Sequence, residues 1–140
     1  MADAPRRFNQ SLTDLNSDDF LFQLYHGAEL LHDDRVHEAK EAIEGALRLQ
    51  PRDPKGQNLL GLVYFRLGVY PHAIGIFEEL VRDYPSEPAP RINLALCFLK
   101  TGQPERARRE LEEVTRLDPS RDRAWGYLGL AYDRLGNPDK

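Results

Sequence analysis

The sequence repeats itself at an interval of 34 residues, and this repeat limits the folds open to the chain. Small residues recur at this interval at Gly27, Gly61, Ala95 and Gly129. Three further columns keep the same register: Ala39, Ala73 and Ala107; Ile43, Phe77 and Leu111; Pro51, Pro85 and Pro119. We therefore divide the chain into units 20–53, 54–87 and 88–121 and a partial unit 122–140, preceded by an extension, 1–19, that we expect to be flexible.

Each full unit carries two helical patterns. In the second unit, Leu60, Tyr64 and Leu67 recur at i, i+4 and i+7, which is the spacing of one helix face. Gly68 then signals the end of the first helix, and Pro85 ends the second. The whole pattern predicts seven helices, near residues 20–33, 36–49, 54–67, 70–83, 88–101, 104–117 and 122–135.

The small residues of the repeat have a steric purpose. Gly61 on a first helix and Ala73 on a second helix allow the two helices of a pair to approach closely. One pair cannot bury its apolar surface alone, whereas a stack of pairs can. We therefore predict an all-α protein made of stacked antiparallel helix pairs.

These residues resemble the tetratricopeptide repeat. Trp125 to Tyr132 reads W-x-x-L-G-x-x-Y, Ala73 to Phe77 reads A-x-x-x-F, and Pro85 follows at the spacing of that family. The resemblance covers residues 20–140, with His26 in place of a usual leucine and Asp34 in place of a usual glycine. It implies a right-handed α-solenoid of about 3.5 repeat units.

The two helix types of each unit differ in polarity. Second helices are amphipathic, and Glu44/Arg48, Glu78/Arg82 and Glu112/Arg116 are i,i+4 pairs with the acid first, the favourable order. We predict these ion pairs on an ordinary solvated face. First helices are apolar nearly all round, as in residues 59–67 and 92–99, and need more cover than the second helices supply.

The resemblance implies that the first helices form a concave groove. By the family's positions its wall consists of Leu24, Ala28, Leu31, His32, Asn58, Leu62, Phe65, Arg66, Ile92, Leu96, Leu99, Lys100, Leu130 and Arg134. The wall is apolar with a rim of Lys and Arg, and exposed apolar surface usually marks a binding site. We therefore expect the groove to bind a peptide or helix of a partner protein.

Several alternatives to an adaptor or scaffold remain open. The chain could be a dedicated chaperone for a secreted client, which co-expression with the client would reveal, or a regulatory module of a larger enzyme. Residues 8–19 or a second copy could also cover the groove. Some family members bind a C-terminal carboxylate through Lys, Asn and Arg on this wall. Only Asn93 and Arg123 match that clamp here, so we expect it to be absent.

Catalytic and cofactor motifs are missing from the sequence. It has no Gly-rich phosphate loop, nucleophile elbow or HExxH motif. His26, His32, His37 and His72 lack metal-ligand spacing, and Cys97 lies in an apolar run typical of a core residue. We therefore predict a non-enzymatic protein without a cofactor.

The charges, the apolar runs and the cysteine count limit the partners and the cellular environment that we expect for the chain. The 23 acidic and 19 basic residues are interleaved, which argues against a nucleic-acid surface. No apolar run approaches the roughly 18 residues of a transmembrane helix. One cysteine fits a reducing, cytoplasmic setting, and 15 Arg against four Lys is typical of a GC-rich bacterial genome.

The end of the sequence carries a helix-start signal. Pro138 follows Pro104, which opens a second helix, by 34 residues. We therefore expect the chain to be the N-terminal part of a longer repeat protein. The missing helix would leave a stripe of Trp125, Leu128, Tyr132 and Leu135 exposed, so we expect self-association through this end.

Overall fold

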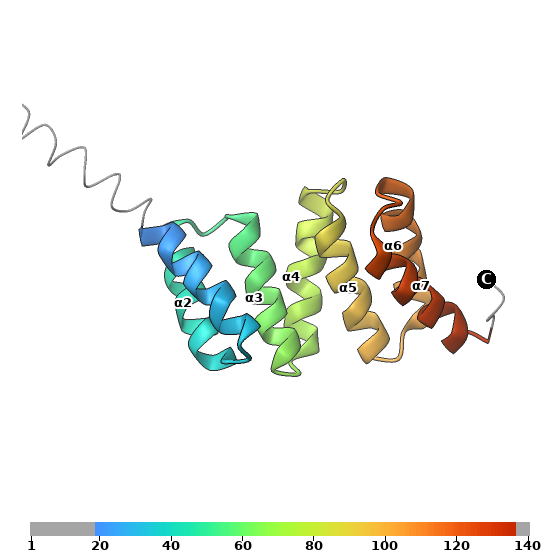
Figure 1. Ribbon diagram of the computed structural model, residues 1–140, viewed down its shortest axis with the longest axis horizontal. Coiled ribbons are helices and arrows are strands. Elements are labelled where there is room, and N and C mark those ends of the chain that lie inside the picture. The colour runs from blue at the N-terminus through green and yellow to red at the C-terminus, as the bar shows by residue number, and fades with distance from the viewer. Residues whose placement is uncertain (1–18, 137–140) are drawn as a thin grey trace, which may run out of the picture. The chain divides into compact units, whose positions relative to one another are not determined.

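The computed structural model describes residues 19–136, and over this range the secondary structure is entirely helical, with short turns between the helices (Figure 1). The first helix covers residues 19–32. It is followed by α2 (Val36–Leu49), α3 (Pro54–Arg66), α4 (Tyr70–Asp83), α5 (Pro88–Lys100), α6 (Pro104–Leu117) and α7 (Asp122–Arg134). The seven predicted helices are confirmed, and each end inside the described range falls within one residue of its predicted position.

Every first helix ends in a left-handed residue at the same repeat position. Gly68, Gly102 and Gly136 have φ values of 77°, 72° and 78°, and Asp34 has a φ of 62°. At Gly68 the amides of residues 68 and 69 donate to the carbonyls of Phe65 (3.0 Å) and Tyr64 (2.9 Å). This is the Schellman arrangement, which satisfies carbonyls that the helix end would leave unpaired.

The chain divides into two compact parts, an N-terminal part, Met1–Val63, and a C-terminal part, Tyr64–Lys140. In the N-terminal part, the helix of residues 19–32 packs against α2. Phe20, Leu24 and Ala46 form an apolar cluster there, with Leu59 of α3 against it. A Cβ atom on Gly27 would lie 2.6 Å from Cγ1 of Ile43, so the close approach of the two helices requires glycine at this position.

In the C-terminal part, α5 packs against both α4 and α6, and α7 packs on α6. Phe77, Phe98, Leu111 and Val114 are among its fully buried side chains. Cys97 is a core residue as predicted, with no exposed surface. Burial raises the pKa of its thiol to about 11, so the thiol stays protonated and unreactive at neutral pH.

The predicted i,i+4 ion pairs of the second helices are wrong. Glu44 pairs instead with Lys40 at 3.4 Å, and Glu78 pairs with Arg106 of α6 at 3.2 Å. Glu112 pairs with Arg108 at 2.8 Å. The acids therefore take partners that the helix spacing alone does not single out, including one from a neighbouring helix.

Candidate protein-binding surfaces

The predicted groove residues of the N-terminal part differ in how deeply their side chains are buried. Leu24 and Leu31 are only 3% and 4% exposed, so their side chains belong to the core. Ala28, Asn58 and Leu62 are half-buried, and His32 is exposed. Of this set, Ala28, Asn58, Leu62 and His32 therefore keep part of their side chains at the surface.

The predicted groove residues of the C-terminal part are likewise divided into buried and accessible side chains. Ile92 and Leu99 are 7% and 5% exposed and support the helices from within. Phe65 and Leu96 are half-buried, and the Phe65 ring meets Tyr70 edge to face at 5.7 Å. The residues of the set with more exposed side chains are Arg66, Lys100, Leu130 and Arg134.

Helices α5 and α7 are in contact, and both carry side chains that reach the surface. A hydrogen bond connects the two helices, because Nη1 of Arg134 on α7 donates to the carbonyl oxygen of Leu99 on α5 at 2.6 Å. At the other end of α7, the Arg123 guanidinium lies 5.7 Å from the Tyr127 ring centroid and its Nη2 donates to Tyr127 Oη at 3.2 Å. We use the name α5–α7 face for six half-buried or exposed residues of these two helices: Asn93, Leu96, Lys100, Tyr127, Leu130 and Arg134.

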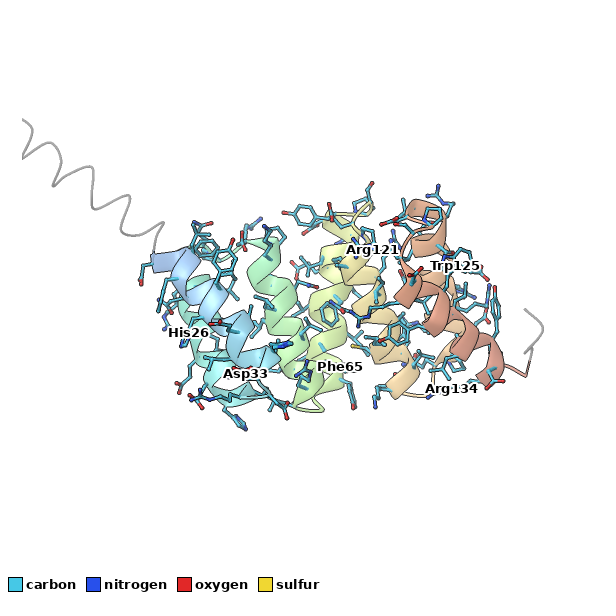
Figure 2. All side chains as sticks on the ribbon, viewed as in Figure 1. His26, Asp33, Phe65, Arg121, Trp125 and Arg134 are labelled. Carbon is cyan, nitrogen blue, oxygen red and sulfur yellow. The ribbon has the colours of Figure 1, made fainter. Side chains whose placement is uncertain are left out.

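The predicted exposed stripe on α7 is discontinuous. Trp125, labelled in Figure 2, is 50% exposed. Its Nε1 donates to the carbonyl oxygen of Pro119 at 2.8 Å. Leu128 is only 6% exposed, which contradicts its expected exposure. Tyr132 and Leu135 are half-buried, and the Tyr132 hydroxyl donates to Glu112 of α6. Trp125 is thus the most open member of the set, and Pro138 lies outside the described residues.

Sequence reasoning missed an exposed apolar patch on the first helix. Leu21, Phe22 and Tyr25 are 41%, 66% and 62% exposed. The Phe22 ring stacks on His26 with centroids 5.6 Å apart. The signal for it was the run of residues 20–25, in which five of six residues are apolar or aromatic, more than one buried helix face can hold.

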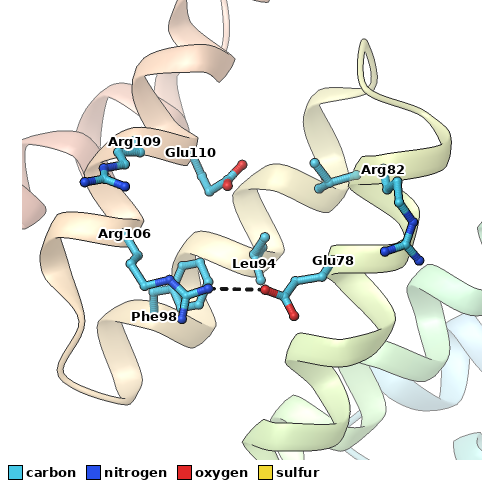
Figure 3. A pocket seen from close by; sticks show the side chains of 8 residues that line it. Glu78, Arg82, Leu94, Phe98, Arg106, Arg109 and Glu110 are labelled. Atoms are coloured by element: carbon cyan, nitrogen blue, oxygen red, sulfur yellow. Dashed lines mark hydrogen bonds and ion pairs between the residues drawn. The ribbon is translucent and has the colours of Figure 1, made fainter.

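It also missed a charged pocket on α4, α5 and α6 (Figure 3). Three arginines and two glutamates from α4 and α6 surround it, and its apolar floor comes mainly from α5. The repeat columns do not predict this pocket, because Glu78 and Arg82 recur in every full unit, whereas Arg106, Arg109 and Glu110 of α6 do not.

Residues 19–136 contain no group of three His, Cys, Asp or Glu side chains placed to hold a metal ion. None of the helices within this range combines the length and the apolar character that crossing a membrane requires.

Family models described as tetratricopeptide repeat match the chain twice, over residues 27–88 and over residues 64–130. A TPR repeat-containing thioredoxin of Arabidopsis thaliana is 35% identical over 79 residues, which is 56% of this chain and 12% of that protein. The heat-shock cognate co-chaperone sgt12 of Aspergillus fumigatus is 34% identical over 62 residues, or 44% of this chain and 18% of that protein. The chain thus spans less than a fifth of the length of either relative.

Solved structures agree on the fold. A thermophilic TPR protein of Thermus thermophilus aligns with a TM-score of 0.80 and 24% identity over 86% of this chain and 68% of its own. The first TPR domain of RPAP3, bound to the HSP90 peptide SRMEEVD, gives 0.77 and 19% over 86% and 95%. The Yersinia enterocolitica type III secretion chaperone SycD gives 0.75 and 18% over 84% and 95%.

Proposed function

Because the chain belongs to the tetratricopeptide repeat family, we propose that it is a protein–protein interaction module, an adaptor or scaffold, that binds a peptide or helix of a partner protein on its first helices. One observation carries the proposal. On the α5–α7 face, Leu96 is half-buried and Leu130 is 39% exposed, with Lys100 and Arg134 beside them. Leucines with cationic neighbours suit a partner segment that has apolar anchors and acidic neighbours.

The energetics of such a contact are adequate. Fully burying one leucine or phenylalanine side chain is worth about 1.5–3 kcal/mol. Three or four such contacts, reduced by the entropic cost of association, give binding of about micromolar strength. The basic residues mainly set the charge preference of the partner and the rate of encounter.

Burial narrows the predicted groove to the residues that a partner can touch. Leu24, Leu31, Ile92 and Leu99 are buried, so their truncation should destabilise the fold by about 2–5 kcal/mol whether or not a partner is present. Leu62 and Leu96 are half-buried and keep part of their side chains at the surface. Substitutions at these two positions separate binding from folding better than substitutions at the other four.

The test is the double variant Leu62→Glu with Leu96→Glu, assayed for capture of a partner from the native lysate. We expect binding to be abolished while the helical content, measured by circular dichroism, stays nearly intact. The matched control is Ile74→Glu with Ile76→Glu, which adds the same charges at half-buried positions of the second helix α4. Equal loss of binding in both variants, or collapse of the dichroism signal together with binding, would contradict the proposal.

A further inference from the structure

A pocket on α4, α5 and α6 lies outside the first-helix surface, by which we mean the half-buried and exposed groove residues of the proposed function (Figure 3). Its volume is about 350 Å³. Leu94 and Phe98 of α5 form its floor, and each is 2% exposed. The lining is completed by Glu78, Val81, Arg82, Arg106, Arg109 and Glu110. The pocket therefore combines an apolar floor with charged walls from two second helices.

Both acids of the pocket are already neutralised within the chain. Arg106 Nη2 donates to Glu78 Oε2 at 3.2 Å, and this pair is drawn as the dashed line in Figure 3. Arg91 Nη1 donates to Glu110 Oε1 at 2.9 Å, and these two side chains are only 16% and 21% exposed. Since each carboxylate has a guanidinium beside it, neither strongly repels an incoming anion.

The arginines of the pocket are less fully compensated. Within residues 19–136, Arg82 makes no hydrogen bond or ion pair. Arg109 is 71% exposed and lies 3.7 Å from Glu105, whose carboxylate is already bonded to Arg108. Arg106 covers the Phe98 ring at 4.2 Å from its centroid. The pocket thus has an arginine without an ion-pair partner among the described residues on its α4 wall, Arg82, and a long ion pair that leaves Arg109 largely exposed on its α6 wall.

The positive charge of the α6 wall is specific to one copy of the repeat, whereas Arg82 of the α4 wall recurs as Arg48 and Arg116. The packing positions Ala107 and Leu111 of α6 repeat in every full unit, whereas Arg106 and Arg109 do not. Their equivalents are Glu38 and Glu41 in the first unit and His72 and Gly75 in the second. Helix packing therefore does not require arginine at these positions.

We propose that this pocket binds an acidic segment of a protein partner, in which an apolar side chain stands between two Asp or Glu side chains. The apolar side chain packs against Val81 and the hydrocarbon stems of the arginines. One flanking carboxylate accepts a charge-assisted hydrogen bond from Arg82, and the other accepts one from Arg109 on the opposite wall (Figure 3). Both arginines turn toward the segment by a change of rotamer, which their exposure permits. The charged walls of the site come from second helices, and its floor residues Leu94 and Phe98 do not belong to the α5–α7 face, so the site is separate from the surface of the proposed function.

The test uses the peptide acetyl-Ser-Asp-Phe-Glu-Ser-amide as a probe, titrated into the ¹⁵N-labelled chain and followed by NMR. We expect chemical-shift changes centred on residues 78–82, 94–98 and 106–110. Arg82→Glu with Arg109→Glu should raise the dissociation constant at least about tenfold, since two charge-assisted hydrogen bonds are lost. The uncharged peptide with Asn and Gln should bind correspondingly weakly.

The matched control is Arg48→Glu with Arg52→Glu, which changes the net charge equally. Arg48 is exposed and occupies the repeat position of Arg82 in the first unit. Equal loss of affinity in the two charge-reversed variants would overturn the proposal, and so would equal binding of the uncharged peptide. If charge reversal unfolds the chain, Arg82→Gln with Arg109→Gln should weaken binding in the same direction.

A last arm separates this site from the first-helix surface. Leu62→Glu with Leu96→Glu should leave the affinity for the probe peptide unchanged. If that variant abolishes peptide binding, the peptide occupies the first-helix surface, and the pocket proposal fails while the proposed function stands. Binding to phosphatidylserine vesicles without any response to the peptide would assign the arginines to a lipid surface and would likewise overturn it.

Discussion

At the scale of single residues, the left-handed position after each first helix governs where the chain turns back. Gly102 holds a φ of 72°, and a Cβ there would meet no atom within 4 Å. The requirement for glycine is therefore one of backbone conformation and not of space. Asp34 occupies the same position in the first unit, which fits the tolerance of aspartate for this conformation.

Gly102→Ala should destabilise the protein by about 1–2 kcal/mol, because a side chain disfavours the left-handed backbone. Gly75→Ala is the matched control. Gly75 lies inside α4, is exposed and likewise has open space where a methyl group would stand, so alanine should stabilise the helix by up to about 1 kcal/mol. Urea unfolding of both variants gives the comparison, and shifts of the same sign would contradict this role of the backbone conformation.

At the scale of helices, the contact of α7 with α6 depends on a polar network as well as on packing. The Tyr132 hydroxyl of α7 donates to Glu112 of α6, which also accepts from Arg108 Nη1 at 2.8 Å. The hydrogen bond from Tyr132 and then the one from Arg108 lower the pKa of Glu112. The network therefore favours the ionised carboxylate and is sensitive to acid.

Tyr132→Phe should cost no more than about 1 kcal/mol at pH 7, because Glu112 remains well solvated. The folded-state pKa of Glu112 lies below its unfolded value, so this stabilisation is present above about pH 4.3 and is lost as the pH falls through the folded pKa. The cost of the substitution should therefore be smaller at pH 3 than at pH 7 in urea unfolding. Tyr127→Phe removes a hydrogen bond to an arginine instead, so its effect should be the same at both pH values, and a pH-independent cost for Tyr132→Phe would contradict the network.

The helix boundaries were predictable from the sequence because their signals are local. Gly68 and Pro85 act on their own segments, and the apolar periodicity needs no knowledge of neighbours. The ion pair of Glu78 was not predictable from local spacing, since Glu78 bonds to Arg106, 28 residues further along the chain. The burial of several predicted groove residues was missed for a related reason. A family position places Leu24 on a helix face, but neighbouring side chains decide that it is 3% exposed.

At the scale of the whole molecule, the family match over residues 27–130 covers most of the described chain and establishes the repeat fold. The fold alone does not fix a partner. What distinguishes this chain is the set of side chains that packing leaves at the surface, such as Leu96 and Leu130 on the α5–α7 face. The proposed function requires that a partner protein covers this surface.

Site-specific photo-crosslinking is the direct test of that requirement. A photoreactive phenylalanine analogue replaces Leu130, which is 39% exposed, or Glu41, which is exposed on the second helix α2. We predict that the Leu130 position yields a discrete crosslinked partner in the native lysate and that the Glu41 position yields none. Crosslinks of equal strength from both positions, or from Glu41 alone, would contradict the proposed function.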